Sequence, residues 1–173
     1  VYGVYDDVID TNDRVPIGNP TTPEIVYGFG PSFHYKGFDF SFFFQGIAKT
    51  SLFMSGLQPF GTTMDNKNVQ TFIAEDHWSP DNQNIFAKYP RLTIERSANN
   101  ATTSTYWERD GAFLKLKNAE IGYTFKSMRF YLRGSNLLTF SKFKLWDPEQ
   151  GGGNGLKYPT QRVFNIGFQM TIK

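Results

Sequence analysis

Aromatic and other apolar residues recur at every second position in several stretches of this 173-residue sequence. The clearest case lies between residues 38 and 45, where one face reads Phe38, Phe40, Phe42 and Phe44. Successive side chains of a β-strand point to opposite faces, so this period predicts strands with one apolar and one polar face. Five such strands are expected, over residues 24–36, 38–48, 113–125, 128–138 and 162–173.

Short turns join four of these strands in pairs. Lys36-Gly37 separates the first two stretches and Lys126-Ser127 separates the third and fourth, which is the spacing of tight β-hairpins. The alternation changes parity within the third stretch, so we expect a β-bulge near Lys117-Asn118.

The other connections are long, over 49–112 and 141–160, so short and long connections alternate along the chain. Outer-membrane β-barrels have short turns on the periplasmic rim and long loops on the extracellular rim. We therefore expect 1–23, 49–112 and 141–160 to be outer loops. A compact soluble domain seldom carries so long an excursion between neighbouring strands.

The composition fits a barrel wall and excludes many other classes of protein. Mean hydropathy is -0.43 although the chain has 18 Phe, 9 Tyr and 3 Trp, as expected when strands face lipid on one side only. No apolar run of ~18 residues occurs, so no membrane-spanning helix is expected. With no cysteine, two histidines and 18 basic against 16 acidic residues, we expect no catalytic site, metal, cofactor or nucleic-acid partner.

A soluble β-sandwich that binds a ligand, such as a carbohydrate-binding domain, would show the same alternation. The two hypotheses differ in whether the rings of Phe38, Phe40, Phe42 and Phe44 face outward or meet inside a core. The opposite face favours the barrel, because it carries residues suited to a wet or plug-filled lumen: Gln45, Glu120, Arg129, Arg133, Asn165 and Gln169.

A series of short sequence words runs in order through nearly the whole chain. They include residues 10–18 (DTNDRVPIG), 78–82 (WSPDN), 107–118 (WERDGAFLKLKN), 134–140 (GSNLLTF) and 147–149 (DPE). Together these words resemble the C-terminal part of SusC/RagA-family TonB-dependent outer-membrane transporters of Bacteroidetes.

The resemblance implies an all-β fold, namely the last five antiparallel strands of a 22-stranded transmembrane β-barrel with two long extracellular loops. It implies a place in the bacterial outer membrane, in contact with lipid and lipopolysaccharide. It also implies an importer of oligosaccharides or peptides that is energised through TonB and works with a SusD-like surface lipoprotein. The plug domain and the other strands are absent from this sequence, so we expect the remainder of the same barrel to accompany it.

Four aromatic residues of the expected outer loops are candidate substrate contacts: Trp78, Tyr106, Trp107 and Trp146. Exposed rings stack well on sugar faces and on peptide side chains. Packing within the loops and an aromatic belt at the membrane interface are the competing explanations. The sequence does not distinguish a glycan from a peptide as the imported substrate.

The remaining loop features predict no chemistry. Residues 65–78 carry apolar side chains at helical spacing and predict a short packing helix capped by Asp65 or Asn66. His77 has no third metal ligand at a recognisable spacing, and the glycine run 151–155 lacks the Lys and the helix of a phosphate loop. The acidic run 6–13 lacks the glycine and regular spacing of a calcium loop, so we expect no calcium there.

Overall fold

The computed structural model describes residues 10–57, 68–94 and 97–172. The chain forms two compact units. The sheet unit comprises Pro20–Ser51, Asp110–Gly151 and Gly155–Lys173, and the loop unit comprises Val1–Asn19, Leu52–Arg109 and Gly152–Asn154.

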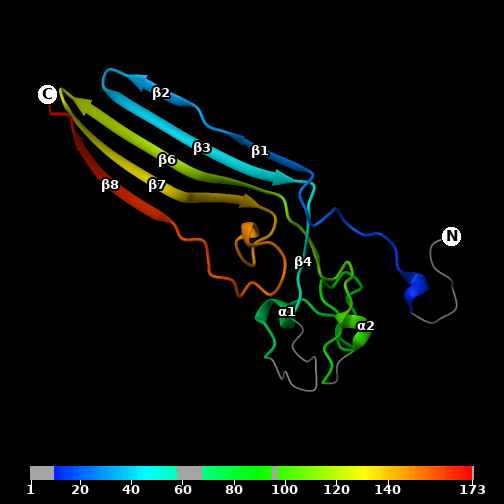
Figure 1. The fold of residues 1–173 in the computed structure, drawn as a ribbon. Helices are drawn as coiled ribbons and strands as arrows, with labels where there is room; N and C mark the ends of the chain where they lie inside the picture. The colour runs from blue at the N-terminus through cyan, green and yellow to red at the C-terminus, as the bar shows by residue number, and fades with distance from the viewer. Residues whose placement is uncertain (1–9, 58–67, 95–96, 173) are drawn as a thin grey trace. The chain divides into compact units, whose positions relative to one another are not determined.

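Within the described residues, the sheet unit holds one six-stranded antiparallel sheet (Figure 1). Its strands in chain order are β1 (Ile25–Phe29), β2 (Ser32–Tyr35), β3 (Phe38–Ala48), β6 (Phe113–Phe125), β7 (Met128–Ser141) and β8 (Val163–Met170). Both β1 and β2 pair with one edge of β3, and β6, β7 and β8 follow in order on its other side.

The strand expected over 24–36 is interrupted and forms the two shorter strands β1 and β2. The break lies at Gly30 and Pro31, where proline has no backbone N–H to give to the ladder. The carbonyl of Pro31 still accepts the N–H of Phe42 at 3.4 Å, so the chain stays beside β3 through the break. Two other boundaries differ by about three residues, since β7 continues to Ser141 and β8 ends at Met170, and the rest agree within about one residue.

Both hairpin turns lie where the sequence predicts them. At the first turn Lys36 has φ 46° and Gly37 has φ 86°, the pair of positive angles that a type I′ hairpin requires. Glycine adopts such an angle without a Cβ penalty, which accounts for its place in this turn. At the second turn Lys126 has φ 54°.

The predicted bulge is confirmed in β6, where the ladder shifts register between Leu116 and Asn118. Across the shift, Ala119 pairs with Phe42 and Leu116 pairs with Phe44, so residues of opposite parity in β6 share one face. The extra residue Lys117 therefore keeps the apolar side chains of this long strand on a single side of the sheet.

The loop unit has a small core of its own. Its short elements are η1 (Thr11–Asp13), α1 (Thr71–Glu75) and α2 (Ala98–Ala101). The ring centroid of Tyr89 lies 5.6 Å from that of Phe72 and 6.0 Å from that of Trp107, and Ile73, Tyr89 and Trp107 are all buried. A separate two-stranded sheet pairs β4 (Ser51–Phe53) with β5 (Glu108–Asp110).

The helix expected within 65–78 is present as α1 but is shorter than the pattern indicated. Its N-cap residue is Gln70, whose side chain makes no capping hydrogen bond. The proposed caps Asp65 and Asn66 lie outside the described residues. None of the helices in the described part of the chain is long and apolar enough to cross a membrane.

Candidate functional site

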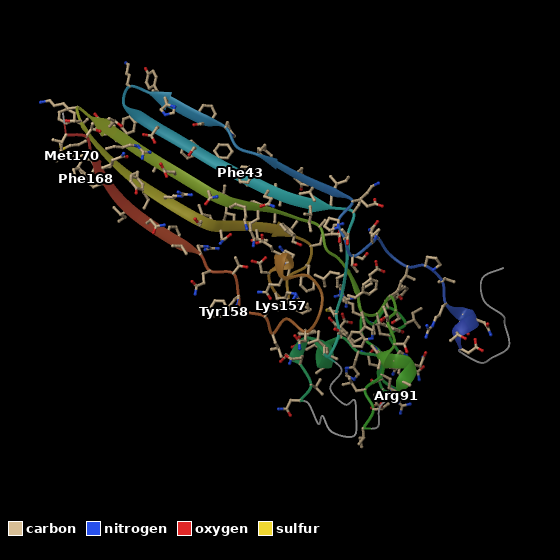
Figure 2. All side chains as sticks on the ribbon, viewed as in Figure 1. Phe43, Arg91, Lys157, Tyr158, Phe168 and Met170 are labelled. Atoms are coloured by element: carbon tan, nitrogen blue, oxygen red, sulfur yellow. The ribbon has the colours of Figure 1, made fainter. Side chains whose placement is uncertain are left out.

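One face of the sheet carries apolar side chains that remain open to solvent. Cross-strand neighbours pair ring with ring on this face, with centroids 4.5 Å apart for Phe38 and Tyr123 and 4.9 Å apart for Phe130 and Phe168. Exposure is high even in the strand interiors, and Ile166 is 89% exposed. Figure 2 shows these side chains projecting from the ribbon, with Phe168 and Met170 labelled near the end of β8.

These exposed rings contradict the soluble sandwich. Phe38 and Phe40 are 55% and 42% exposed, while Phe42 and Phe44 are half-buried against neighbouring rings on the same face. A sandwich would cover such a face with a second sheet, because burying rings is the main source of its stability. The rings face outward instead, as a lipid-facing barrel wall requires.

The opposite face is polar and carries every lumen residue that the alternation predicted. The register places Glu120 beside Arg133, and Arg133 beside Asn165. Arg129 lies beside Gln169, and Gln45 beside Lys115. Phe43 is an exception, because its ring lies on this face and is 41% exposed (Figure 2).

An ionic network crosses three strands of the polar face. Nε of Arg129 donates to Oδ1 of Asp39 at 3.1 Å, and Nη2 donates to Oδ2 of Asp39 and to Oε1 of Glu120, the latter at 2.6 Å. These bonds link β7 to β3 across the intervening strand β6. They pass over Gly122, where a Cβ atom would lie 2.6 Å from Oδ2 of Asp39 and 2.7 Å from Nη2 of Arg129.

A second ionic cluster joins the polar face to the segment that follows β7. The ammonium group of Lys115 donates to Oδ2 of Asp147 at 2.6 Å and to Oε2 of Glu149 at 2.7 Å, and Lys117 reaches Oε1 of Glu149 at 2.7 Å. The side chain of Lys115 is 1% exposed. These carboxylates belong to the short helix η2 (Pro148–Gln150) and its N-cap.

The cluster holds both carboxyl groups in their charged form. Burial alone would raise the pKa of Asp147, but hydrogen bonds from Lys115 and from the Glu149 N–H outweigh it, so the pKa lies below its ordinary value. The pKa of Glu149 is lowered in the same way, against burial, by hydrogen bonds from Lys115 and Lys117. Sequence reasoning missed this cluster, although Lys115 stands on the polar parity of β6 beside two leucines.

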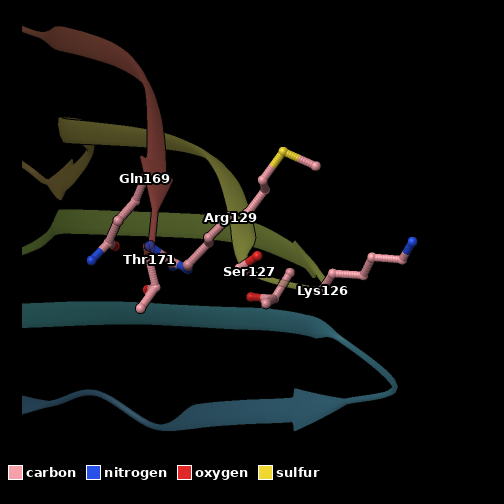
Figure 3. Close-up of a pocket in the computed structure, with 7 residues that line it drawn as sticks. Lys126, Ser127, Arg129, Gln169 and Thr171 are labelled. Atoms are coloured by element: carbon pink, nitrogen blue, oxygen red, sulfur yellow. The ribbon is translucent and has the colours of Figure 1, made fainter. Parts of the chain in front are cut away.

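Two of the hollows on the described surface have polar linings near the residues discussed above. Figure 3 shows the first, of about 580 Å³, which lies at the Lys126-Ser127 turn and is lined by polar side chains including Arg129, Gln169 and Thr171. The second, of about 860 Å³, lies in the loop unit between residues 10–17 and 98–105, and Tyr106 follows its lining directly in sequence.

The four candidate aromatic residues have different environments. Tyr106 is 43% exposed and Trp78 is half-buried. Trp146 is half-buried, stands edge-on to Phe143 at 4.6 Å and donates its indole N–H to the carbonyl of Gly151. Trp107 is only 3% exposed and donates to the carbonyl of Asn100, so the expectation of an exposed ring is wrong for this residue.

The described residues contain no group of acidic and histidine side chains that could hold a metal ion. Asp10 and Asp13 form a reciprocal capping box around η1, which occupies carboxylate oxygens of both residues. The rest of the acidic run, residues 6–9, lies outside the described part. Nδ1 of His77 lies 2.8 Å from the carbonyl oxygen of Ala74, a contact at the end of α1.

An antiparallel sheet with an exposed aromatic face, a charged opposite face and tight turns at one end defines a wall segment of a transmembrane β-barrel. The chain is 30% identical over 195 residues to TonB-dependent receptor P26 and 32% identical over 185 residues to TonB-dependent receptor P3, both of Formosa agariphila. It belongs to the SusC/RagA family of TonB-dependent receptors, as the C-terminal part of such a protein. It is therefore a segment of a bacterial outer-membrane protein.

The matches cover almost all of this chain but little of the relatives. They span 96% and 94% of the chain against 19% and 18% of P26 and P3, so the chain is about a fifth as long as these receptors. TonB-dependent receptor SusC of Bacteroides thetaiotaomicron is 24% identical over 174 residues, covering 94% of the chain and 16% of SusC. The sequence matches no protein-family model.

Solved structures show the same fold. The RagAB peptide importer in its open-open state superposes with a TM-score of 0.73 at 23% identity, over 99% of this chain and 20% of that one. The structure described as the RagAB peptide transporter gives a TM-score of 0.74 at 24% identity, over 94% and 19%. At these identities the likeness shows the fold, an antiparallel segment of a barrel wall.

Proposed function

We propose that this chain forms part of the wall and outer loops of a TonB-dependent importer. The observation that supports the proposal best is the separation of the two faces, with exposed rings for lipid and a charged face for an aqueous lumen. We place the Lys36-Gly37 and Lys126-Ser127 turns in the periplasm and the 49–112 and 141–160 segments outside the cell. The remaining strands of a 22-stranded barrel and the plug complete the protein.

The cargo of this importer is an oligosaccharide or a peptide. Two solved structures of similar fold are described as a peptide importer and a peptide transporter, which supports the peptide class. A SusD-like lipoprotein is the proposed outer partner, and TonB supplies energy through the part of the protein that lies outside this chain. The barrel wall is in contact with membrane lipid and lipopolysaccharide.

In this proposal the chain makes and breaks no covalent bond of the cargo. Import needs binding and displacement, and the exposed or half-buried rings Trp78, Tyr106 and Trp146 are the candidate contacts. Trp107 lies in the core of the loop unit, where its ring packs on Tyr89.

The orientation is tested by labelling the full-length receptor in intact cells. Two single-cysteine variants at exposed positions, Ser127→Cys in a turn and Lys144→Cys in an outer segment, are treated with a maleimide that does not cross the outer membrane. We expect the Lys144→Cys receptor to be labelled in intact cells and the Ser127→Cys receptor to be labelled only after permeabilisation. The reverse pattern would contradict the proposed topology.

The cargo class is tested by growth of cells with and without the receptor gene on oligosaccharides or on peptides as the sole nutrient. Loss of growth on one of these classes identifies the cargo, while unchanged growth and uptake on both would contradict the importer. Purification of the receptor from outer membranes tests the partner, since a SusD-like lipoprotein is expected to copurify.

A further inference from the structure

Lys115 is the one charged side chain that is fully buried among the described residues. Its neighbours across the ladder are the neutral residues Gln45 and Thr139, so the sheet itself offers the ammonium group no counter-charge. Both carboxylates that contact it, from Asp147 and Glu149, come from the segment after β7. A buried ammonium group is stable only with such partners, so the burial of Lys115 depends on that segment being in place.

Contacts within the segment from Lys142 to Gly151 hold these carboxylates in place. Phe143 is buried and packs against Trp146, whose indole N–H closes the segment onto the carbonyl of Gly151. Asp147 caps η2 by accepting the N–H of Glu149 at 3.1 Å through Oδ1, which leaves Oδ2 for Lys115. The segment therefore docks as one preformed piece on the polar face.

We propose that Lys115 is the positioning residue that fixes the 142–151 segment on the polar face of the sheet. This part of the outer segment is then held against the polar face, where Trp146 has a defined place, and does not move freely. The assignment of this face to a lumen rests on the proposed function, whereas the fixing of the segment does not. Lys117 adds a second contact to Glu149 and is 22% exposed.

Hydrogen–deuterium exchange of the full-length receptor in detergent tests this role. The amides of Gln150 and Gly151, which donate to the carbonyls of Asp147 and Pro148, report on the segment. Lys115→Met keeps the apolar stem of the side chain and removes the charge, so exchange of these amides should accelerate at least about tenfold. Trypsin cleavage after the exposed residues Lys144 and Lys157 should accelerate in parallel.

A double-mutant cycle separates positioning from general damage. Asp147→Asn keeps an oxygen for the η2 cap but removes the charge that Lys115 contacts. If Lys115 acts through this carboxylate, Lys115→Met with Asp147→Asn will exchange little faster than the worse single variant. Lys142→Met is the matched control, because Lys142 lies in the same segment, is 86% exposed and forms an ion pair with Asp110 at 3.4 Å instead of with Asp147 or Glu149. This variant should exchange at the wild-type rate.

Two results would overturn the inference. One is unchanged exchange and cleavage in Lys115→Met, provided that the barrel still shifts in mobility on heating as the wild type does. If Lys115→Met fails to assemble, Glu149→Gln takes its place, and unchanged exchange there has the same meaning. Exchange and cleavage in detergent depend neither on import nor on the orientation of the receptor in the membrane. A negative result here is therefore distinct from a negative result in the labelling experiment that tests the proposed function.

Discussion

Gly122 shows how one small residue makes room for charge on the polar face. Asp39 pairs directly across from it, and Arg129 reaches over it to that carboxylate. A side chain at this position would occupy the space of the ion pair. The polar parity of Asp39 and Arg129 follows from the alternation, but their contact does not, because it joins strands that are not neighbours in the sheet.

We expect Gly122→Val to separate the Asp39 and Arg129 side chains and to destabilise the barrel by about 1–3 kcal/mol, the usual cost of overpacking a filled site. The measurement is the temperature to which samples of the full-length receptor must be heated before the compact form disappears in gel electrophoresis. Thr124→Val is the control, because Thr124 is an exposed residue of the same strand and face. Equal thermal stability of the two variants would contradict this role of Gly122.

The 142–151 segment should loosen in acid. The pKa values of Asp147 and Glu149 are lowered in the folded state, so their contribution is fully present above the ordinary carboxyl pKa and is lost as pH falls through the lowered values. Exchange of the Gln150 amide, corrected for the intrinsic pH dependence, should therefore rise below about pH 4. A receptor with both Asp147→Asn and Glu149→Gln should show no such rise, and an identical rise in that variant would exclude these groups as the cause.

At the scale of elements, the period-two pattern sufficed for the long strands because each strand has one apolar and one polar face. The missing N–H of Pro31 indicates an interruption of the strand. The alternation continues across it, however, because Phe29 and Phe33 lie on one face, and so the pattern predicts a single strand. The strands β4 and β5 are too short to show a period and were not predicted. Trp107 was misjudged because loop sequence carries no sign of whether a ring faces water or a local core.

A pair of substitutions on β3 tests which face meets lipid. Phe40→Lys places a charge among the exposed rings, where lysine costs about 2–4 kcal/mol at the bilayer midplane and less toward the interface, so assembly should fall. Ser41→Lys, one residue further along on the polar face, should be tolerated. The measurement is the amount of heat-modifiable receptor in the outer membrane. Similar yields for both variants would contradict the assignment of faces.

At the scale of the whole molecule, the sheet is open on both sides. The described residues leave β8 with a partner on one edge only, and β1 and β2 likewise. Unpaired backbone groups are costly in lipid, so the sheet needs the strands of the remaining barrel. A barrel inferred from the sequence implies this requirement. The sequence does not identify the cargo, because the chain is about a fifth of the length of its relatives.

We therefore expect the isolated 173-residue chain to aggregate in buffer and to show no heat-modifiable form in detergent, in contrast to the full-length receptor. Light scattering and gel mobility measure the two properties. A soluble, monomeric chain that unfolds cooperatively without detergent would contradict the barrel interpretation, because its exposed rings would then require another cover.

The extra residue in β6 makes chain length as important as residue type. Phe113–Leu116 and Asn118–Phe125 are two halves of one strand held in opposite phase by Lys117. Deleting that single residue would rotate one half by half a turn and exchange the sides on which its leucines and its charges lie. Among relatives, we expect substitutions in this strand to be common and insertions or deletions to be almost absent, so that the length of the strand, which sets the height of the wall, varies less than its composition.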